Sequence, residues 1–580
     1  MIFTLFGIVL FAAPLLLLRK FKDKRYGFAA IVSLMIAGHW LIAAASQALH
    51  IFHYAVITII HTGIAVALIA GFKKPEGSWR EWRKRIDWVA IVVLAIACMH
   101  LFRVHYSYTG KIADIRSHLT RQDSREVTSM RYPWPYFADE WCAIAFVKHS
   151  IEHHSLPLKN PFIPRRSRFP NFEAAFHSLL AEIMLLMQLD PVTDYTKITL
   201  VVGMLICLLL YLLLVHCGIH RLVAAIAALC ALYITNGANL PGIWTLLPLI
   251  MGLVAMLSGM FFFVNNSVPM MLFATATTLL LYPPLVVFWA PGYIAGVLVA
   301  PEVSWKTRLK NVALLVLLIG GSAAIVALFY LLAQGKKAPP LIDMVISKVL
   351  YTTPIEGAIP DYSLWHIVPI PVLALSLVGL YALIKKKVMW CVVMALVGIG
   401  YCIAYSFTTF RVVIEYERVA VVTALLLVVC AGFGLEFLLK KLGTVAAFRN
   451  KILINSALAG VLMILSGLSF RYTERENWSR LVLREIGSNR IMVPASPANA
   501  YLHADDLRLF EHIQGKYFLS HPWKGSVIAV ATGNYPVSCK PGTITVNPDL
   551  FREFMMAGCA EKHEIAKKWS IDYVYAPAIQ

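Results

Sequence analysis

Residues 196–215 read TKITLVVGMLICLLLYLLLV, an apolar run with Lys197 as its one charged residue. An α-helix rises about 1.5 Å per residue, so a run of this length crosses the roughly 30 Å hydrocarbon core of a bilayer. Similar runs recur along the 580-residue chain, which is 59% hydrophobic and only 14% charged. Soluble domains carry about 25% charged residues. The composition therefore excludes a water-soluble fold and predicts a polytopic α-helical membrane protein.

The apolar runs predict about fourteen transmembrane helices. Their approximate ranges are 1–18, 27–46, 54–72, 87–102, 196–215, 222–236, 243–263, 268–283, 285–301, 311–333, 364–384, 388–408, 419–438 and 452–470. The first run has no basic residue before it and several after it. This pattern predicts an uncleaved helix whose N-terminus lies outside.

Lys and Arg residues alternate between the two sides of this arrangement. They occupy the loops 19–25, 73–85, 306–310, 385–387 and 440–451 and position 221, whereas 45–53, 236–243 and the turn at Tyr282 have none. The positive-inside rule then places the basic loops in the cytoplasm and 103–195, 334–363, 409–418 and 471–580 outside. Much of the net charge of +20 therefore orients the chain in an inner or plasma membrane, and a nucleic-acid partner is not expected.

The chain divides into three predicted parts. Residues 1–86 form an N-terminal three-helix membrane extension, 87–470 a transmembrane module with the large outer loop 103–195, and 471–580 an extracytoplasmic α/β domain. In the outer loop, 139–154 is expected to be a helix. Phe172, Phe176, Leu179, Ile183 and Leu186 mark the apolar stripe of a second helix, from which Glu173 and His177 are excluded. Such helices suit a juxtamembrane position.

The C-terminal part reads as a small α/β unit. Gly525–Ala531 (GSVIAVA) is expected to be a buried strand and Ile571–Tyr575 (IDYVY) another, with a helical segment over Leu550–Lys568. An extracytoplasmic location would be compatible with a disulfide between Cys539 and Cys559.

Candidate catalytic groups gather in the outer loop rather than in the spans, which hold very few Asp, Glu, Lys or Arg residues. Asp139 and Glu140 open the first loop helix, and Arg165, Arg166 and Arg168 follow in the same loop. A carboxylate can deprotonate an acceptor hydroxyl, and guanidinium groups bind phosphate in bidentate fashion. These residue types suit the displacement of a phosphate leaving group.

Each of these groups also has a structural explanation that the sequence leaves open. Asp139 can cap the helix, and the loop arginines can contact lipid headgroups. Arg411 and Arg418 either bind carrier phosphate or pair with the neighbouring glutamates Glu415 and Glu417. His149, His153 and His154 have no matching acid or histidine set after them, so they are interpreted as solvated. No metal ligands are predicted, a divalent metal is disfavoured, and the sequence requires no cofactor.

Several short motifs follow one another in a recognisable order. The acid pair is followed by Leu156–Phe162 (LPLKNPF), Gln188–Pro191 (QLDP), His216–Gly218 (HCG) and a Tyr-Pro-Pro turn at Tyr282. The chain thereby resembles the GT-C superfamily of polyprenyl-phosphate-dependent glycosyltransferases, which includes the lipid A aminoarabinose transferases and protein O-mannosyltransferases. The resemblance covers roughly residues 87–440 and, more loosely, the C-terminal part.

This resemblance implies transfer of a sugar from a lipid-phosphate carrier to a glycan, lipid or protein acceptor on the outer side, usually with inversion. By position, Asp139 matches the general base, with Glu140 as its substitute. The five arginines named above would bind the carrier phosphate. His154, Lys159, Asn160 and Tyr282 would bind substrate. The chain departs from the family pattern in two ways. Many members carry a second acid in the next outer loop, whereas the loop 236–242 has none. The C-terminal part also lacks the Trp-Trp-Asp motif of the oligosaccharyltransferases, which disfavours that subclass.

Two other functions remain open. A lipid-linked sugar flippase or other transporter is permitted by the number of helices, but few charges in the spans, no inverted repeat and the large outer loop argue against it. A non-enzymatic assembly protein of the cell envelope would also fit, since a missing second acid is typical of a degenerate active site. If the chain is a glycosyltransferase, as the resemblance implies, it serves the biosynthesis of cell-envelope glycans.

Overall fold

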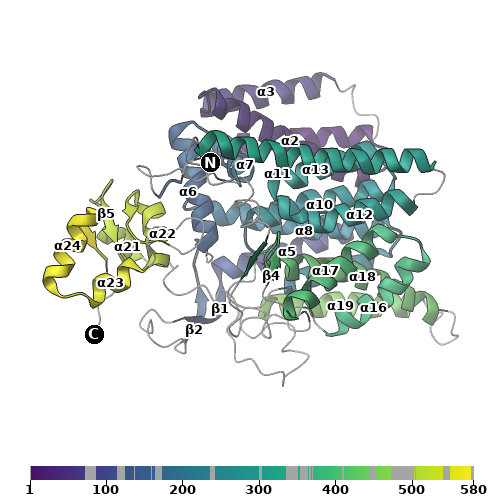
Figure 1. Ribbon diagram of the computed structural model, residues 1–580. Coiled ribbons are helices and arrows are strands. Elements are labelled where there is room, and N and C mark those ends of the chain that lie inside the picture. Colours follow the sequence, from purple (N-terminus) through teal and green to yellow (C-terminus); the bar gives the residue numbers. More distant parts are fainter. Residues whose placement is uncertain are drawn as a thin grey trace.

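The computed structural model of the chain is a bundle of apolar helices with a smaller C-terminal segment at one end (Figure 1). It describes residues 2–71, 87–113, 124–135, 138–158, 160–162, 171, 173–234, 242–299, 304–334, 350–352, 364, 368, 370–407, 410–443, 451–471, 502, 504–539 and 549–575. Strands in this part are short, and the helices form the core.

The bundle begins with helix α1 (Ile2–Ala12), which continues as the 3-10 helix η1 (Ala13–Lys20). Then come α2 (Lys24–Ala48), α3 (Tyr54–Ala70) and α5 (Trp88–Tyr106). Aspartates cap two of these helices: the Asp23 carboxylate accepts from the backbone N–H groups of Arg25 and Tyr26, and that of Asp87 from Ala90. Such caps satisfy donors that the first turn of a helix leaves without partners.

The remaining bundle helices lie where the sequence predicts apolar runs. They are α8 (Tyr195–His216), α9 (Arg221–Cys230), η3 (Ala231–Tyr233), α10 (Pro248–Val264), α11 (Val268–Leu281), η4 (Pro283–Leu285), α12 (Val286–Val299), α13 (Trp305–Gln334), α16 (Ile370–Lys385), α17 (Met389–Phe407), α18 (Tyr416–Leu442) and α19 (Lys451–Arg471). Six described spans are long and apolar enough to cross a membrane: Ile2–Lys20, Lys24–Ala48, Trp88–Tyr106, Tyr195–His216, Trp305–Ala324 and Tyr416–Leu442. The chain is therefore an integral membrane protein, and the count of fourteen crossings stays a prediction.

At one end of the bundle, polar contacts connect the helix ends that lie beside the basic loops. His216 Nδ1, at the end of α8, lies 2.9 Å from the carboxylate of Asp23, which precedes α2. Glu436, near the end of α18, accepts from the backbone N–H of His220 at 3.1 Å. The positive-inside rule assigns all of these helix ends to the same side of the membrane. Their assignment to the cytoplasm stays a prediction.

Close helix packing depends on small residues. A Cβ added at Gly379 of α16 would lie 1.8 Å from the backbone oxygen of Cys430 in α18, and one at Gly434 would lie 2.0 Å from that of Leu375. The approach lets Ser376 Oγ donate to the Leu427 backbone oxygen at 2.7 Å. Van der Waals contact and interhelical hydrogen bonds of this kind hold helices together in lipid.

Both predicted helices of the outer loop are confirmed, as α6 (Ala138–His153) and α7 (Ala174–Leu186). On α7, Phe176, Leu179 and Leu186 of the predicted stripe are buried, while Phe172 lies outside the described residues. The loop also holds an antiparallel pair, β1 (Tyr108–Ala113) and β2 (Ser124–Met130). A second pair, β3 (Leu350–Thr352) and β4 (Phe410–Val412), joins the segments 334–363 and 409–418, both of which are predicted to lie outside.

The C-terminal segment is built around a three-stranded parallel sheet of order β6-β5-β7. Its elements are α21 (Ala504–Leu509), β5 (Tyr517–Leu519), α22 (Pro522–Thr532), β6 (Tyr535–Pro536), α23 (Leu550–Met556), α24 (Cys559–Trp569) and β7 (Tyr573–Val574). The expected strand at Ile571–Tyr575 and the helical segment over Leu550–Lys568 are confirmed, the latter as two helices. Cys539 is buried and Cys559 exposed, and both are free thiols rather than a disulfide.

The predicted strand Gly525–Ala531 is wrong, because this segment lies in α22. Pro522 lies in the first turn of α22, and Gly533, with φ of 72°, ends it. Val527 to Val530 are all buried, and α22 packs against both β6 and α6. A helix covered on several sides shows no polar face, so its sequence lacks the period that distinguishes it from a buried strand.

Two described hydrogen bonds join the C-terminal segment to the outer loop, in addition to the packing of α22 against α6. Lys148 Nζ of α6 donates to the backbone oxygen of Val530 at 3.3 Å, and the Leu502 backbone N–H donates to the hydroxyl of Tyr132 at 2.7 Å. The C-terminal segment, α6 and α7 consequently lie at the same end of the bundle (Figure 1).

Candidate functional site

Polar groups from distant parts of the chain converge at the end of the bundle that carries α6 and α7. The central contact is made by Arg418 in the first turn of α18. Its Nη1 donates to the Tyr282 hydroxyl at 2.7 Å, its Nε lies 3.0 Å from Glu415 Oε2, and its guanidinium lies 5.6 Å from the centre of the Tyr282 ring. Arg418 and Tyr282, both predicted site residues, are thus brought together. Pairing of Arg418 with Glu415, which the sequence left open, also occurs.

Glu173, which precedes α7, belongs to the same group, although it was not predicted as a site residue. It interacts electrostatically with Arg418 and Glu415. Desolvation raises the pKa of its carboxyl above the usual value, Arg418 opposes this, and Glu415 reinforces it. The side chain is partly exposed, so its pKa reflects both surrounding protein and access to solvent. Its position off the apolar stripe of α7 was the signal that could have identified it.

Asp139 and Glu140 lie in the first turn of α6, as predicted. Glu140 is buried, and its Oε1 accepts from the backbone N–H of Leu246 at 2.8 Å. The hydroxyl of Tyr195 donates to the backbone oxygen of the same Leu246. Glu140 and Tyr195 therefore bind the backbone N–H and the backbone oxygen of Leu246, respectively, and fix the segment before α10. Glu140 thus has a structural role.

Asp139 is partly exposed, unlike its neighbour. Cys142 follows it by three residues, so the two share a face of α6. Cys142 in turn interacts electrostatically with Glu173. Because α6 packs against α7, Asp139 lies at the same end of the bundle as Glu173.

Two predicted substrate-binding residues make contacts within the protein that position the backbone. His154 has a φ of 50°, and its Nδ1 lies 2.7 Å from the backbone oxygen of Phe52, in the turn between α2 and α3. The ring of His154 also lies 3.8 Å from that of His53, measured between centroids. Asn160 is buried, and its side-chain oxygen accepts from the Phe162 backbone N–H at 2.9 Å. Their proposed contact with substrate stays a prediction.

The remaining predicted residues are described only in part. Lys159, Arg165, Arg166 and Arg168 lie outside the described residues. Arg411 is described by its backbone alone, paired with Tyr351 across β3 and β4. Among the described residues, one group could hold a metal ion: His39, His61 and Glu182, which no sequence pattern singled out.

No family model and no curated protein matches the chain. Its structure is similar to that of the Archaeoglobus fulgidus oligosaccharyltransferase. The form with an inhibitory peptide and a dolichol-phosphate has 15% identity and a TM-score of 0.47, covering 86% of this chain and 70% of that one. The apo form has 14% identity and a TM-score of 0.46 over the same shares. The form tethered to an acceptor peptide has 15% identity and a TM-score of 0.45, over 85% and 69%.

All three are structures of an oligosaccharyltransferase, a subclass that the missing Trp-Trp-Asp motif of this chain disfavours. Because the identity is low, no residue role is transferred from them.

Proposed function

We propose that the chain is a GT-C-type membrane glycosyltransferase that moves a sugar from a polyprenyl-phosphate carrier to an acceptor on the extracytoplasmic side. The observation that carries the proposal is Arg418, held between Tyr282 and Glu415 beside Glu173, at the end of the bundle where α6 presents Asp139. Charged groups at the end of apolar helices can meet a lipid that keeps its tail in the membrane and its phosphate at the surface.

Arg418 is proposed to bind the carrier phosphate. A guanidinium carries five N–H donors, and the contacts of Nη1 with Tyr282 and of Nε with Glu415 leave Nη2 for a phosphate oxygen. The hydrogen bond to Tyr282 fixes the guanidinium before the carrier arrives. Such preorganised donors stabilise the negative charge that develops on a leaving group.

Asp139 is proposed as the general base. Its carboxylate takes the proton of the acceptor hydroxyl or amide while the acceptor atom bonds to the anomeric carbon. The bond from that carbon to the phosphate oxygen breaks, and polyprenyl phosphate leaves with the electron pair. Single displacement inverts the anomeric centre and needs no general acid, since phosphate is a good leaving group. Glu140 is assigned a supporting role because it already binds Leu246.

The proposal keeps the three-part division of the chain. Residues 1–86 form a membrane extension, 87–470 the catalytic module and 471–580 a domain beside the active site. α6, α7 and the C-terminal segment share one end of the bundle, opposite the ends beside the basic loops. This arrangement supports an extracytoplasmic active site with an extracytoplasmic C-terminal domain.

One observation favours a transporter as the second candidate. Glu182, His39 and His61 are ionisable groups buried among the helices, and such groups mark ion or substrate paths in transporters. They lie on α2, α3 and α7, whereas Arg418 lies on α18 and Asp139 on α6, so the group suits a separate structural role better.

Sealed proteoliposomes distinguish the two candidates. They are loaded with a panel of polyprenyl-phosphate sugars labelled in the sugar, with peptide, lipid and glycan acceptors added outside. A transferase consumes the carrier, releases polyprenyl phosphate and labels an acceptor. Movement of intact carrier between leaflets without consumption, equal in wild type and Asp139→Asn, would replace the transferase by a flippase. Glu152→Gln, an exposed acid on the same helix, serves as the matched control.

A further inference from the structure

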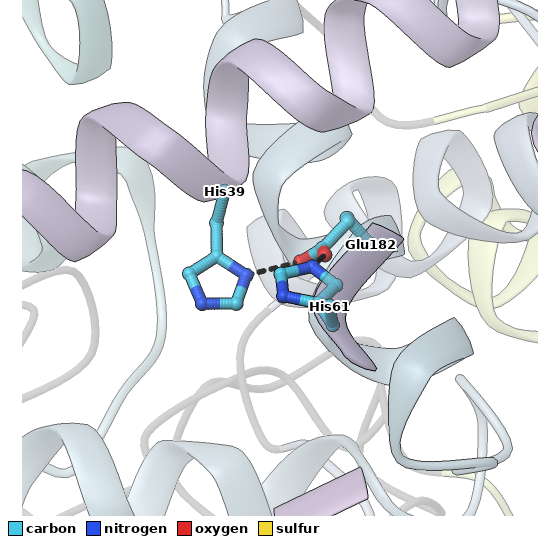
Figure 2. A group of neighbouring side chains, drawn as sticks. All are labelled: His39, His61 and Glu182. Carbon is cyan, nitrogen blue, oxygen red and sulfur yellow. Dashed lines mark hydrogen bonds and ion pairs between the residues drawn. The ribbon is translucent and has the colours of Figure 1, made fainter. Parts of the chain in front are cut away.

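Three side chains from three separate helices meet inside the protein (Figure 2). His39 of α2 has Nδ1 2.8 Å from Glu182 Oε2, and His61 of α3 has Nε2 2.5 Å from Glu182 Oε1. Glu182 lies on α7 of the outer loop. All three residues are almost completely buried, with exposures of 4%, 4% and 0%. One carboxylate thus joins two imidazoles at a place that solvent does not reach.

We propose that His39, His61 and Glu182 bind a divalent transition metal, with Zn²⁺ as the best match. Two imidazole nitrogens and one carboxylate are a known ligand set for zinc, which binds nitrogen and oxygen at about 2.0–2.2 Å. The three ligand atoms lie within 4.8 Å of one another, so small side-chain shifts bring each into bonding distance. A water molecule or a further group would complete a tetrahedral shell.

The hydrogen bonds to Glu182 show how the metal would enter. Each imidazole presents an N–H to the carboxylate, at the position where a bound ion would lie between them. On binding, the proton of each ring moves to its other nitrogen, and the freed lone pair bonds to the metal. A divalent ion would offset the negative charge of Glu182. A buried charge without compensation is costly.

Ring contacts hold the two histidines in place. The rings of His39 and His61 stack with centroids 4.7 Å apart and planes 21° apart, and Phe11 lies 4.7 Å from His39 on the same measure. Ligands that packing has already oriented lose little entropy when an ion binds.

The position of the group defines what the metal would do. His39 and His61 belong to the N-terminal extension, whereas Glu182 belongs to the outer loop. A bound ion would fasten α2 and α3 to α7, the helix that Glu173 precedes. His154 makes a second contact between the same two parts through Phe52. The metal would therefore have a structural role: it would hold the N-terminal extension against the outer loop, and it would not take part in the proposed catalysis.

The test measures metal bound to the full chain. Protein is purified in detergent with a histidine-free tag and no chelator, and its metal content is determined by mass spectrometry. We expect about one ion per chain. Chelated protein is then titrated with ZnCl₂ while thermal unfolding is followed. Losing even an outer-shell partner weakens metal binding by roughly 10–100-fold, so Glu182→Gln and His39→Ala are expected to weaken it about 100-fold or more.

Matched controls separate this site from surface binding and from misfolding. The double variant His149→Ala/His153→Ala removes two neighbouring histidines of α6 and is expected to leave the metal content unchanged. Glu182→Gln preserves the shape of the side chain, and the chelated wild type tests the site without any substitution. Chelated wild type that takes up no Zn²⁺ and shows no change in melting temperature would overturn the proposal, as would Glu182→Gln that binds as tightly as wild type. Either result would leave His39, His61 and Glu182 as a hydrogen-bonded cluster only.

Discussion

Arg418 and Tyr282 are 136 positions apart in the sequence, yet the guanidinium of one donates to the hydroxyl of the other at 2.7 Å. The bond joins the turn between α11 and η4 to the first turn of α18. It fixes the only guanidinium of the proposed phosphate-binding set whose side chain the structure describes.

Substitutions at Arg418 should separate charge from geometry. Arg418→Lys keeps the positive charge but loses the planar fork, so we expect carrier binding to weaken by about tenfold or more. Tyr282→Phe removes the hydrogen bond between the Tyr282 hydroxyl and the Arg418 guanidinium, and a hydrogen bond to a charged group contributes about 1.5–3 kcal/mol. We expect carrier binding to weaken because the guanidinium is then less well positioned. Binding of a fluorescent polyprenyl phosphate by purified variants measures both. Arg221→Lys, an exposed arginine at the first position of α9, is the control. Unchanged affinity in Arg418→Lys would remove this residue from the phosphate site.

Glu140 should matter for stability more than for chemistry. Glu140→Ala leaves the buried Leu246 N–H without its acceptor, which costs about 1–3 kcal/mol, whereas Glu140→Gln retains an acceptor oxygen and should cost less. Melting temperatures measured in detergent should be lower for Glu140→Ala than for Glu140→Gln. A Glu140→Gln protein that melts like wild type but transfers no sugar would instead give Glu140 the role assigned to Asp139.

Glu173 should make stability depend on pH. Its pKa in the folded chain lies above the ordinary 4.5, so the folded chain keeps this proton to higher pH than the unfolded chain does. The slope of stability against pH follows the difference in bound protons. Glu173 therefore lowers stability as pH rises from 4.5 through its folded pKa. Glu173→Gln should abolish that decline in melting temperature. Coincident pH profiles for wild type and Glu173→Gln would contradict the raised pKa, and Glu152→Gln supplies the baseline for an exposed acid.

The C-terminal segment should depend on one buried ion pair. Lys524 pairs with Asp506, and the hydroxyl of Tyr575 donates to the same carboxylate at 2.6 Å. Burial lowers the pKa of Lys524, and Asp506 opposes this. Lys524→Met removes the cation and leaves a buried carboxylate, a loss of roughly 3–5 kcal/mol, whereas Lys524→Met/Asp506→Asn should recover most of it. Limited proteolysis of the full chain reports on this segment. Equal protease resistance of the single variant and wild type would show that the pair contributes little.

The sequence predicted the features that rest on long apolar runs. Every predicted run falls on a described helix, and both outer-loop helices lie where their stripes indicated, because lipid and core packing select apolar side chains at helical spacing. It failed at α22, where burial on several sides removes that spacing. Glu173 was placed off the apolar stripe of α7 but was not predicted as a site residue, because the sequence does not show which polar groups of other elements it meets.

His39 and His61 were missed for a different reason. The scarcity of Asp, Glu, Lys and Arg pointed away from the spans, although His39 and His61 are also ionisable residues within apolar runs, and such residues are a functional signal. Their common partner Glu182 lies 121 positions beyond His61, so no local spacing could have connected them. Only the packing of α2 and α3 against α7 does so.

The measurement that tests the account most directly compares wild type with Asp139→Asn, each in nanodiscs, for binding and turnover of a polyprenyl-phosphate sugar in the presence of acceptor. We predict that wild type binds the carrier and releases polyprenyl phosphate, while Asp139→Asn binds it with similar affinity and releases none. Full turnover by Asp139→Asn, or no binding of any carrier by well-folded wild type, would contradict the account.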